Sequence, residues 1–159
     1  SDSEKYLKKF LYKIIFFKGI EEDYYYGDGW IFKTEILSNK GAHGLLLLGK
    51  VFQQMGKIDS AIETFRKIKG TPEIESKAAN NLGILYLILN QPDMALTEFE
   101  RSLRLNPKLP DSHYNLGKLI LDSNGNIESA RAHLNAAFSL TQNPILKTQI
   151  KNLLFQISS

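Results

Sequence analysis

The sequence has no cysteine, which excludes disulfides, cysteine-ligated zinc and a thiol nucleophile. It also has no long hydrophobic run: the apolar stretches 14–17 and 45–48 hold four residues each, whereas a membrane span needs about 20. A strong charge of one sign is missing as well, because the formal net charge is only +3. Since nucleic-acid binding usually needs a clustered basic face, this small surplus argues against that class.

The composition that remains is that of one soluble globular domain, with 43% hydrophobic and 23% charged residues among 159. No signal-peptide pattern follows Ser1, because Lys8, Lys9, Lys13 and Lys18 interrupt the apolar stretch. The chain does not begin with methionine, so a fragment from which a signal or anchor was removed stays an alternative. The compartment is therefore left open between the cytoplasm and a periplasmic or membrane-associated location.

A repeat runs through most of the chain. Three Leu-Gly pairs end at Gly49, Gly83 and Gly117, so successive glycines lie 34 residues apart. An alanine follows each glycine after 12, 12 and 13 residues, and a large apolar residue stands four positions beyond each alanine. These alanines are Ala61, Ala95 and Ala130, and the large apolar residues are Phe65, Phe99 and Leu134. The extra residue of the third unit falls in the turn-forming segment 122–126.

This pattern resembles the tetratricopeptide repeat (TPR), a 34-residue unit with the motifs L-G-x2-Y and A-x3-F and a closing proline. The resemblance covers residues 42–141. It implies an all-α fold, a right-handed superhelix of stacked helix pairs. We expect three units over about 42–75, 76–109 and 110–144 within a repeat region 41–144, a capping helix over 145–159, and a degenerate repeat or N-terminal cap over 1–40.

The residue spacing supports helices independently of the resemblance. Apolar residues recur at i, i+3, i+4 and i+7, as on one face of a helix. A glycine inside a helix costs about 1 kcal/mol relative to alanine, so a glycine at a fixed period predicts close approach of paired helices. The expected helices span 42–55, 58–69, 73–90, 92–105, 110–123, 127–141 and 145–157.

Residues 1–40 carry a weaker signal and two readings stay open. One is a degenerate helix pair; the other is a β-hairpin, because aromatic runs flank a glycine turn in segment 25–32. Segment 5–16 interleaves lysines with aromatic residues, which suits packing on the repeats, contact with a membrane surface or partner, or RNA binding. We favour packing on the repeats.

The resemblance implies that the first helices of the pairs line a concave, partner-binding groove. Asn81 and Asn115 take the same position of successive repeats, and a primary amide can pair with both C=O and N–H of an extended backbone. Apolar residues on this face need a covering partner, and its lysines favour an acidic or C-terminal ligand. The expected groove residues are Leu46, Lys50, Lys77, Asn80, Asn81, Ile84, Leu87, Ile88, Tyr114, Asn115 and Lys118.

One TPR subclass clamps the C-terminal carboxylate of heat-shock chaperones with Lys and Asn side chains. Here the matching positions hold Leu46, Lys50, Asn81, Asp111 and Asn115. Only Asn81 agrees with the clamp, and Asp111 would repel a carboxylate. We therefore expect no clamp of this kind.

No motif indicates catalysis. The chain has no G-x-S-x-G sequence, and His43, His113 and His133 do not have a metal-ligand spacing such as H-x3-H. We expect no enzyme activity, no cofactor, no metal site and no small-molecule substrate. The leading hypothesis is a protein-binding adaptor or scaffold domain. Its alternatives are a structural or self-associating module, whose groove is filled by the N-terminal segment or a second chain in a homodimer, and a helical repeat that binds RNA.

Overall fold

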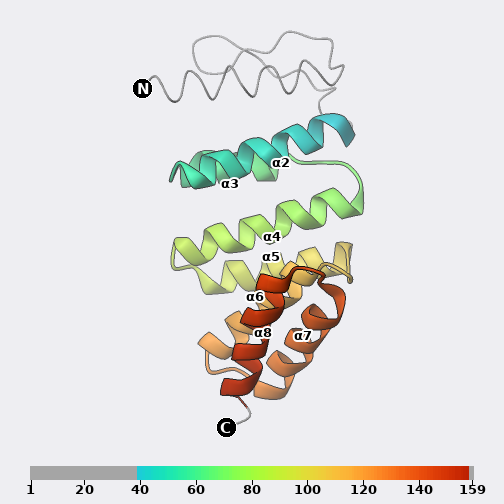
Figure 1. Cartoon of the computed structure of the whole chain (residues 1–159). Helices are drawn as coiled ribbons and strands as arrows, with labels where there is room; N and C mark the ends of the chain where they lie inside the picture. Colours follow the sequence, from blue (N-terminus) through green and yellow to red (C-terminus); the bar gives the residue numbers. More distant parts are fainter. Residues whose placement is uncertain (1–38, 158–159) are drawn as a thin grey trace, which may run out of the picture. The chain divides into compact units, whose positions relative to one another are not determined.

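The computed structural model describes residues 39–157, and these residues form helices without strands. Figure 1 shows the helices in chain order. They are α2 (Asn39–Gln54), α3 (Ile58–Arg66), α4 (Pro72–Ile88), α5 (Pro92–Leu105), α6 (Pro110–Asp122), α7 (Ile127–Leu140) and α8 (Pro144–Gln156). The expected all-α fold with a C-terminal capping helix is confirmed. The readings of residues 1–38 as a cap, a hairpin or a basic helix lie outside the described residues.

The helix boundaries agree closely with those expected, and the largest differences, of three residues each, are the earlier start of α2 at Asn39 and the earlier end of α3. This helix ends at Arg66, three residues before the expected end, and the chain then tightens through a bond from the Ile68 N–H to the Phe65 carbonyl. Gly70 and Pro72 follow, and the residue before a proline avoids the helical conformation. Pro72, Pro92, Pro110 and Pro144 each begin a helix, where a missing N–H costs no hydrogen bond.

The turns inside the helix pairs repeat with the same 34-residue period. Gly56, Asn90 and Asn124 have φ values of 71°, 56° and 52°, the left-handed conformation that ends many helices. At each turn an N–H one residue later donates back to a carbonyl five residues earlier, as from Gln91 to Tyr86. In the third pair the extra residue is Gly125, which follows the reversal at Asn124 and precedes the α7 cap. The insertion is thus confined to the turn.

The chain divides into two compact units after Ile74. In the first unit α2 packs on α3 where Gly49 meets the Phe65 ring: a Cβ on the glycine would lie 2.5 Å from ring Cε1. In the second unit Gly83 meets the Phe99 ring in the same way, and Gly117 meets Leu134. The expected close approach of paired helices at the periodic glycines is confirmed.

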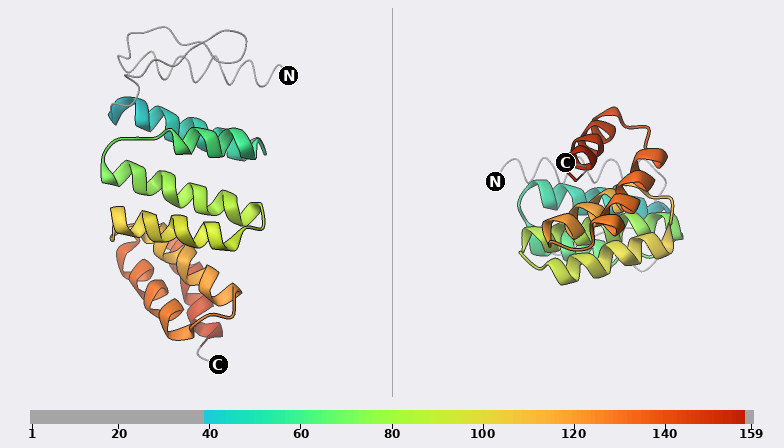
Figure 2. Two further views of the ribbon diagram at one scale, coloured as in Figure 1. Left: turned by 180° about the vertical axis from the view of Figure 1, so that it is seen from behind. Right: turned by 90° about the horizontal axis from the view of Figure 1, so that it is seen from below.

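The second unit ends with a hydrophobic cluster between α7 and α8. Leu134 and Ala137 of α7 and Leu146 and Ile150 of α8 form its buried centre. Figure 2 shows α6, α7 and α8 gathered at the C-terminal end of this unit. The Asn143 side chain caps α8 by accepting from the N–H groups of Ile145 and Leu146. No helix within residues 39–157 combines the length and the hydropathy needed to cross a membrane.

Candidate functional site

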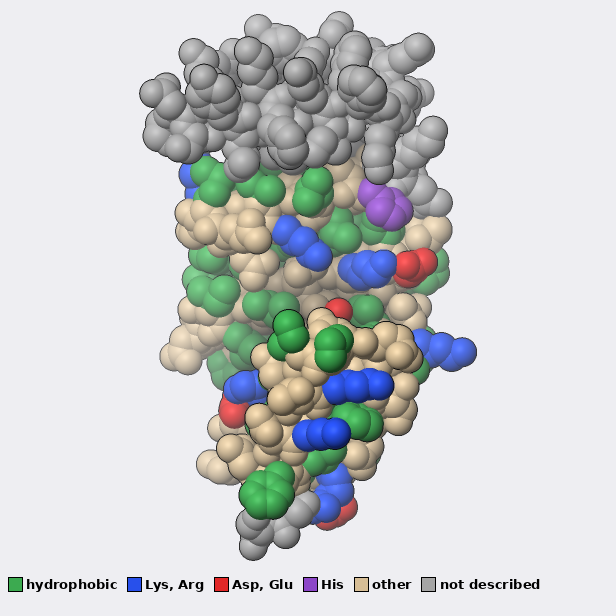
Figure 3. Space-filling model, viewed as in Figure 1, with side chains coloured by type: hydrophobic (Ala, Val, Ile, Leu, Met, Phe, Trp, Pro, Cys, Tyr) green, Lys and Arg blue, Asp and Glu red, His purple; other side chains and the backbone are tan. Residues whose placement is uncertain are grey.

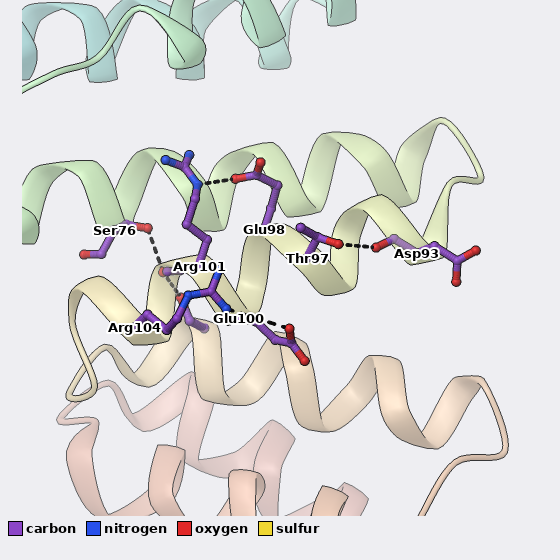
Figure 4. A network of polar contacts seen from close by, with 9 residues as sticks. Ser76, Asp93, Thr97, Glu98, Glu100, Arg101 and Arg104 are labelled. Atoms are coloured by element: carbon purple, nitrogen blue, oxygen red, sulfur yellow. Dashed lines mark hydrogen bonds and ion pairs between the residues drawn. The ribbon is translucent and has the colours of Figure 1, made fainter.

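The first helices of the second and third repeats, α4 and α6, are joined by a chain of buried polar contacts that also includes α5. The Ser102 hydroxyl lies 2.7 Å from the Ser76 carbonyl oxygen, which accepts its hydrogen bond (Figure 4), and 2.6 Å from the Ser112 hydroxyl. Ser112 in turn donates to Oδ1 of Asn80 at 3.1 Å. Nδ2 of Asn115 donates to the same Oδ1 at 2.9 Å. This series of hydrogen bonds therefore ends at the side-chain amides of Asn80 and Asn115, on the predicted groove face.

This arrangement fixes the orientation of Asn80. Its Oδ1 accepts from both Ser112 and Asn115, so the Asn80 NH₂ group points away from these donors. Asn115 keeps its own Oδ1 and a second N–H, because only one N–H is used by Asn80. Asn80 is itself buried, at 7% exposure, whereas Asn115 is half-buried and is the more accessible amide of the pair.

Asn81 lies beside this pair on α4 but is held by its own helix. Its Nδ2 donates to the Lys77 carbonyl at 2.8 Å, and the residue is only 9% exposed. The structure thus pairs Asn115 with Asn80 instead of with Asn81, the residue at the equivalent repeat position. The repeat period did not predict the bond between Asn80 and Asn115, because these residues are 35 positions apart, one more than the repeat.

The apolar part of the expected face lies at the C-terminal end of α4. Ile84 is half-buried, whereas Leu87 and Ile88 are 39% and 55% exposed. The neighbouring Leu89 is also exposed, at 40%. Leu87 and Ile88 are thus the exposed large aliphatic residues of this end of α4, and Leu89 lies just beyond the helix.

Helix α8 covers another part of the expected groove. Tyr114 and Leu121 of α6 pack against the cluster that Leu146 and Ile150 of α8 share with α7. Tyr114 is half-buried as a result, so much of this aromatic ring is already used within the chain. The sequence predicted a capping helix but not its contact with Tyr114, one of the expected groove residues.

The positive charge of the face is smaller than the sequence implied. Lys118 forms an ion pair with Asp122 one helical turn away, which neutralises part of its charge. Further along, Lys147 and Lys151 of α8 place their Nζ atoms 5.5 and 5.7 Å from the centre of the Phe138 ring. On the face shown in Figure 3, Lys and Arg side chains lie beside hydrophobic ones in this part of the second unit.

Among the remaining expected residues, Lys77 is half-buried on α4, and Leu46 and Lys50 belong to α2 in the first unit. Leu46 is half-buried and Lys50 is exposed. The candidate site consists of residues of α4 and α6 in the second unit.

The buried serines are the feature of this region that the repeat pattern did not predict. Ser76, Ser102 and Ser112 are all 0% exposed. One signal was available: Ser102 follows Ala95 and Phe99 at i+7 and i+3, which places it on the buried face of α5. A polar residue at such a position indicates a buried hydrogen bond.

Family models decide the classification. Tetratricopeptide repeat models match residues 42–70, 76–109 and 110–144, together more than half of the chain. The chain belongs to the tetratricopeptide repeat family. The resemblance inferred from the Leu-Gly period is thereby confirmed. No curated protein matches the TPR chain over its sequence.

Solved structures share the fold. The TPR chain resembles PcrH from Pseudomonas aeruginosa, with a TM-score of 0.65 and 17% identity over 80% of this chain and 96% of that one. It also resembles the Yersinia enterocolitica type III secretion chaperone SycD in complex with a peptide of the translocator YopD, with a TM-score of 0.62 and 20% identity over 73% and 91% of the two chains. A third is the first TPR of Spaghetti (RPAP3) bound to an HSP90 peptide, with a TM-score of 0.58 and 17% identity over 74% and 94%.

Proposed function

We propose that this chain is a non-catalytic module that binds a segment of another protein along the shared face of α4 and α6. The observation that carries the proposal is the amide pair Asn80 and Asn115, whose 2.9 Å hydrogen bond joins the two helices. Membership of the TPR family supports a protein-interaction role. SycD and RPAP3, which share the fold, each have a structure with a peptide of another protein.

The chemistry of the face favours an extended peptide with apolar side chains. The Oδ1 and the second N–H of Asn115 match one N–H and one C=O group of such a backbone, while the buried Asn80 holds Asn115 in place. Leu87 and Ile88, 39% and 55% exposed, offer the apolar contact. Acidic character in the ligand is a weaker preference, because Lys118 already pairs with Asp122.

The test is selection of binding peptides from a displayed random library, followed by isotherms on purified chain. Ile88→Glu should weaken the selected peptides at least tenfold, because a charge would replace the apolar contact. Asn115→Ala should also weaken them, because it removes one ligand-facing amide and the bond to Asn80. Both variants should keep the helical circular dichroism spectrum of the parent.

Met94→Glu on α5 is the matched control. Met94 is 44% exposed, close to the exposure of the α4 patch, but it lies in a second helix of a pair. It should leave peptide affinity unchanged. Equal effects of Met94→Glu and Ile88→Glu would count against the proposed face.

Self-association is the second candidate, and the same exposed residues favour it. A second copy would cover Leu87 and Ile88 as well as a peptide would. Size-exclusion chromatography with light scattering over a range of concentrations separates the two. A dimer that Ile88→Glu converts to monomer supports self-association, and a concentration-independent monomer supports the peptide-binding module.

A further inference from the structure

Two histidines that are 20 residues apart in the sequence meet between the helices of the third repeat. Nδ1 of His113 on α6 lies 3.0 Å from Nδ1 of His133 on α7. The ring centroids are 5.3 Å apart and the rings are inclined by 36°. The fold thus brings the Nδ1 atoms of the two imidazole rings together, although the spacing of the histidines in the sequence does not predict this contact.

The hydrogen bonds define which nitrogen carries each proton. Nε2 of His113 lies 2.9 Å from the Pro107 carbonyl oxygen, which can only accept, so this Nε2 is protonated. In a neutral ring Nδ1 of His113 is then an acceptor. Its lone pair faces His133, which supplies the shared proton from its own Nδ1.

This bond from Nε2 to a backbone carbonyl is the arrangement that supports metal-ligating histidines. Such a histidine usually donates its second ring N–H to a carbonyl or carboxylate, which fixes the ring and its tautomer. Pro107 does this for His113. Two imidazole nitrogens on a tetrahedral zinc ion at about 2.0–2.1 Å are roughly 3.3 Å apart, close to the distance between these two Nδ1 atoms.

We propose that His113 and His133 form a two-histidine site for a divalent transition metal ion, with Zn²⁺, Ni²⁺ and Cu²⁺ as the suited ions. Imidazole nitrogen suits these ions, whereas Mg²⁺ and Ca²⁺ require oxygen ligands. No group of three or more His, Asp or Glu side chains within residues 39–157 is arranged for a metal ion. Water therefore completes the coordination, and the bound ion links α6 to α7.

The binding step balances without loss of a proton. Two dative bonds form, one from each Nδ1 to the ion, and the Nδ1–H of His133 breaks. That proton leaves to solvent while Nε2 of His133 takes one up, so the ring changes tautomer and stays neutral. The carboxylate of Glu100 on α5 acts electrostatically on His133 and favours a cation beside it.

The test uses the full chain and Zn²⁺ as the probe. Calorimetry should give one zinc ion per chain, and excess Zn²⁺ should raise the melting temperature reversibly, with EDTA restoring the original value. His113→Gln and His133→Gln should each abolish both responses. His43→Gln, on α2, should retain them, and Mg²⁺ should produce no shift.

Three results would overturn the site: no response to Zn²⁺, a response that survives in either His113→Gln or His133→Gln, or an equal shift with Mg²⁺. A second measurement needs no variant and so does not depend on their folding. Electron paramagnetic resonance of the unmodified chain with one equivalent of Cu²⁺ should show coupling to two imidazole nitrogens. Coupling to one nitrogen or to none would also contradict the proposal.

Discussion

Gly83 lies directly against the ring of Phe99, and a Cβ on this glycine would come within 2.7 Å of ring Cδ1. Real Cβ atoms essentially never approach a carbon so closely, and Phe99 is 0% exposed, so its ring is enclosed by neighbouring residues. The glycine is therefore required by packing, although glycine inside a helix is intrinsically unfavourable.

Gly83→Ala should destabilise the fold. Better helix propensity would contribute about 1 kcal/mol of stability, but overpacking against a buried ring costs about 1–3 kcal/mol. The net result is a lower urea midpoint. The substitution should be milder in a Phe99→Leu background, because the third repeat pairs Gly117 with Leu134 at a looser 3.0 Å. A higher midpoint for Gly83→Ala alone would refute the packing requirement.

The buried serine chain predicts a second effect. The hydroxyls of Ser102 and Ser112 have two protons between them but three contacts to serve, to Ser76, to each other and to Asn80. Ser112→Ala removes one proton and one acceptor from this buried chain and should cost about 1–3 kcal/mol of unfolding free energy. Ser102→Ala with Ser112→Ala should cost less than the two single losses added together, because the residues share partners.

Ser139→Ala is the control for that measurement. Its hydroxyl donates to the Asn135 carbonyl at 3.0 Å on an exposed part of α7. Removing it should change the unfolding free energy by no more than about 0.5 kcal/mol. A loss equal to that of Ser112→Ala would mean that burial does not set the cost.

Helix α8 offers two isoleucines with opposite environments. Ile150 is 0% exposed in the α7–α8 cluster, whereas Ile145 on the same helix is 69% exposed. Ile150→Ala should cost about 2–5 kcal/mol, because it leaves a cavity, and Ile145→Ala should be nearly neutral. Chemical denaturation of the two variants measures the difference. Similar losses would show that α8 does not cap the third repeat through this cluster.

The pKa of His133 predicts a pH dependence of stability in the metal-free chain. Burial lowers this pKa below the usual 6.5, the neighbouring His113 lowers it further, and Glu100 opposes the shift. The unfolded chain then binds the proton more readily, so stability is full above about pH 6.5 and is lost as the pH falls through the folded-state pKa.

His133→Gln should remove this part of the pH dependence. Urea unfolding in the presence of a chelator, at several pH values on both sides of 6.5, gives the free energy of unfolding for parent and variant. The amount by which the parent's free energy of unfolding exceeds that of the variant should shrink as the pH decreases. A difference in unfolding free energy that grows toward acidic pH would contradict a lowered pKa of His133.

Periodic local signals made the helices and the hairpin packing predictable. Gly49 and Gly83 recur at a fixed interval, and their partners Phe65 and Phe99 recur with them, so one repeat explained the next. Tyr114 was harder, because its cover by α8 depends on how the last helix turns back on the array. The 34-residue repeat pattern does not predict the direction of this last helix.

Contacts between residues at non-equivalent repeat positions also could not be predicted from the 34-residue period. Asn115 bonds to Asn80 across 35 residues, and His113 meets His133 across 20. Both depend on side-chain directions across packed helices, which the 34-residue rule does not describe. The pairing of expected groove residues with the binding function stays a prediction.

The third turn gives the chain a place to accept foreign sequence. Asn124 has already reversed the backbone when Gly125 adds its extra residue, and Asn126 then starts α7 by accepting from the Ser129 N–H. A tag grafted between Gly125 and Asn126 would extend from the hairpin tip without disturbing the capped helix that follows. A fluorophore or an affinity handle could therefore be carried internally, with both ends of the protein left free.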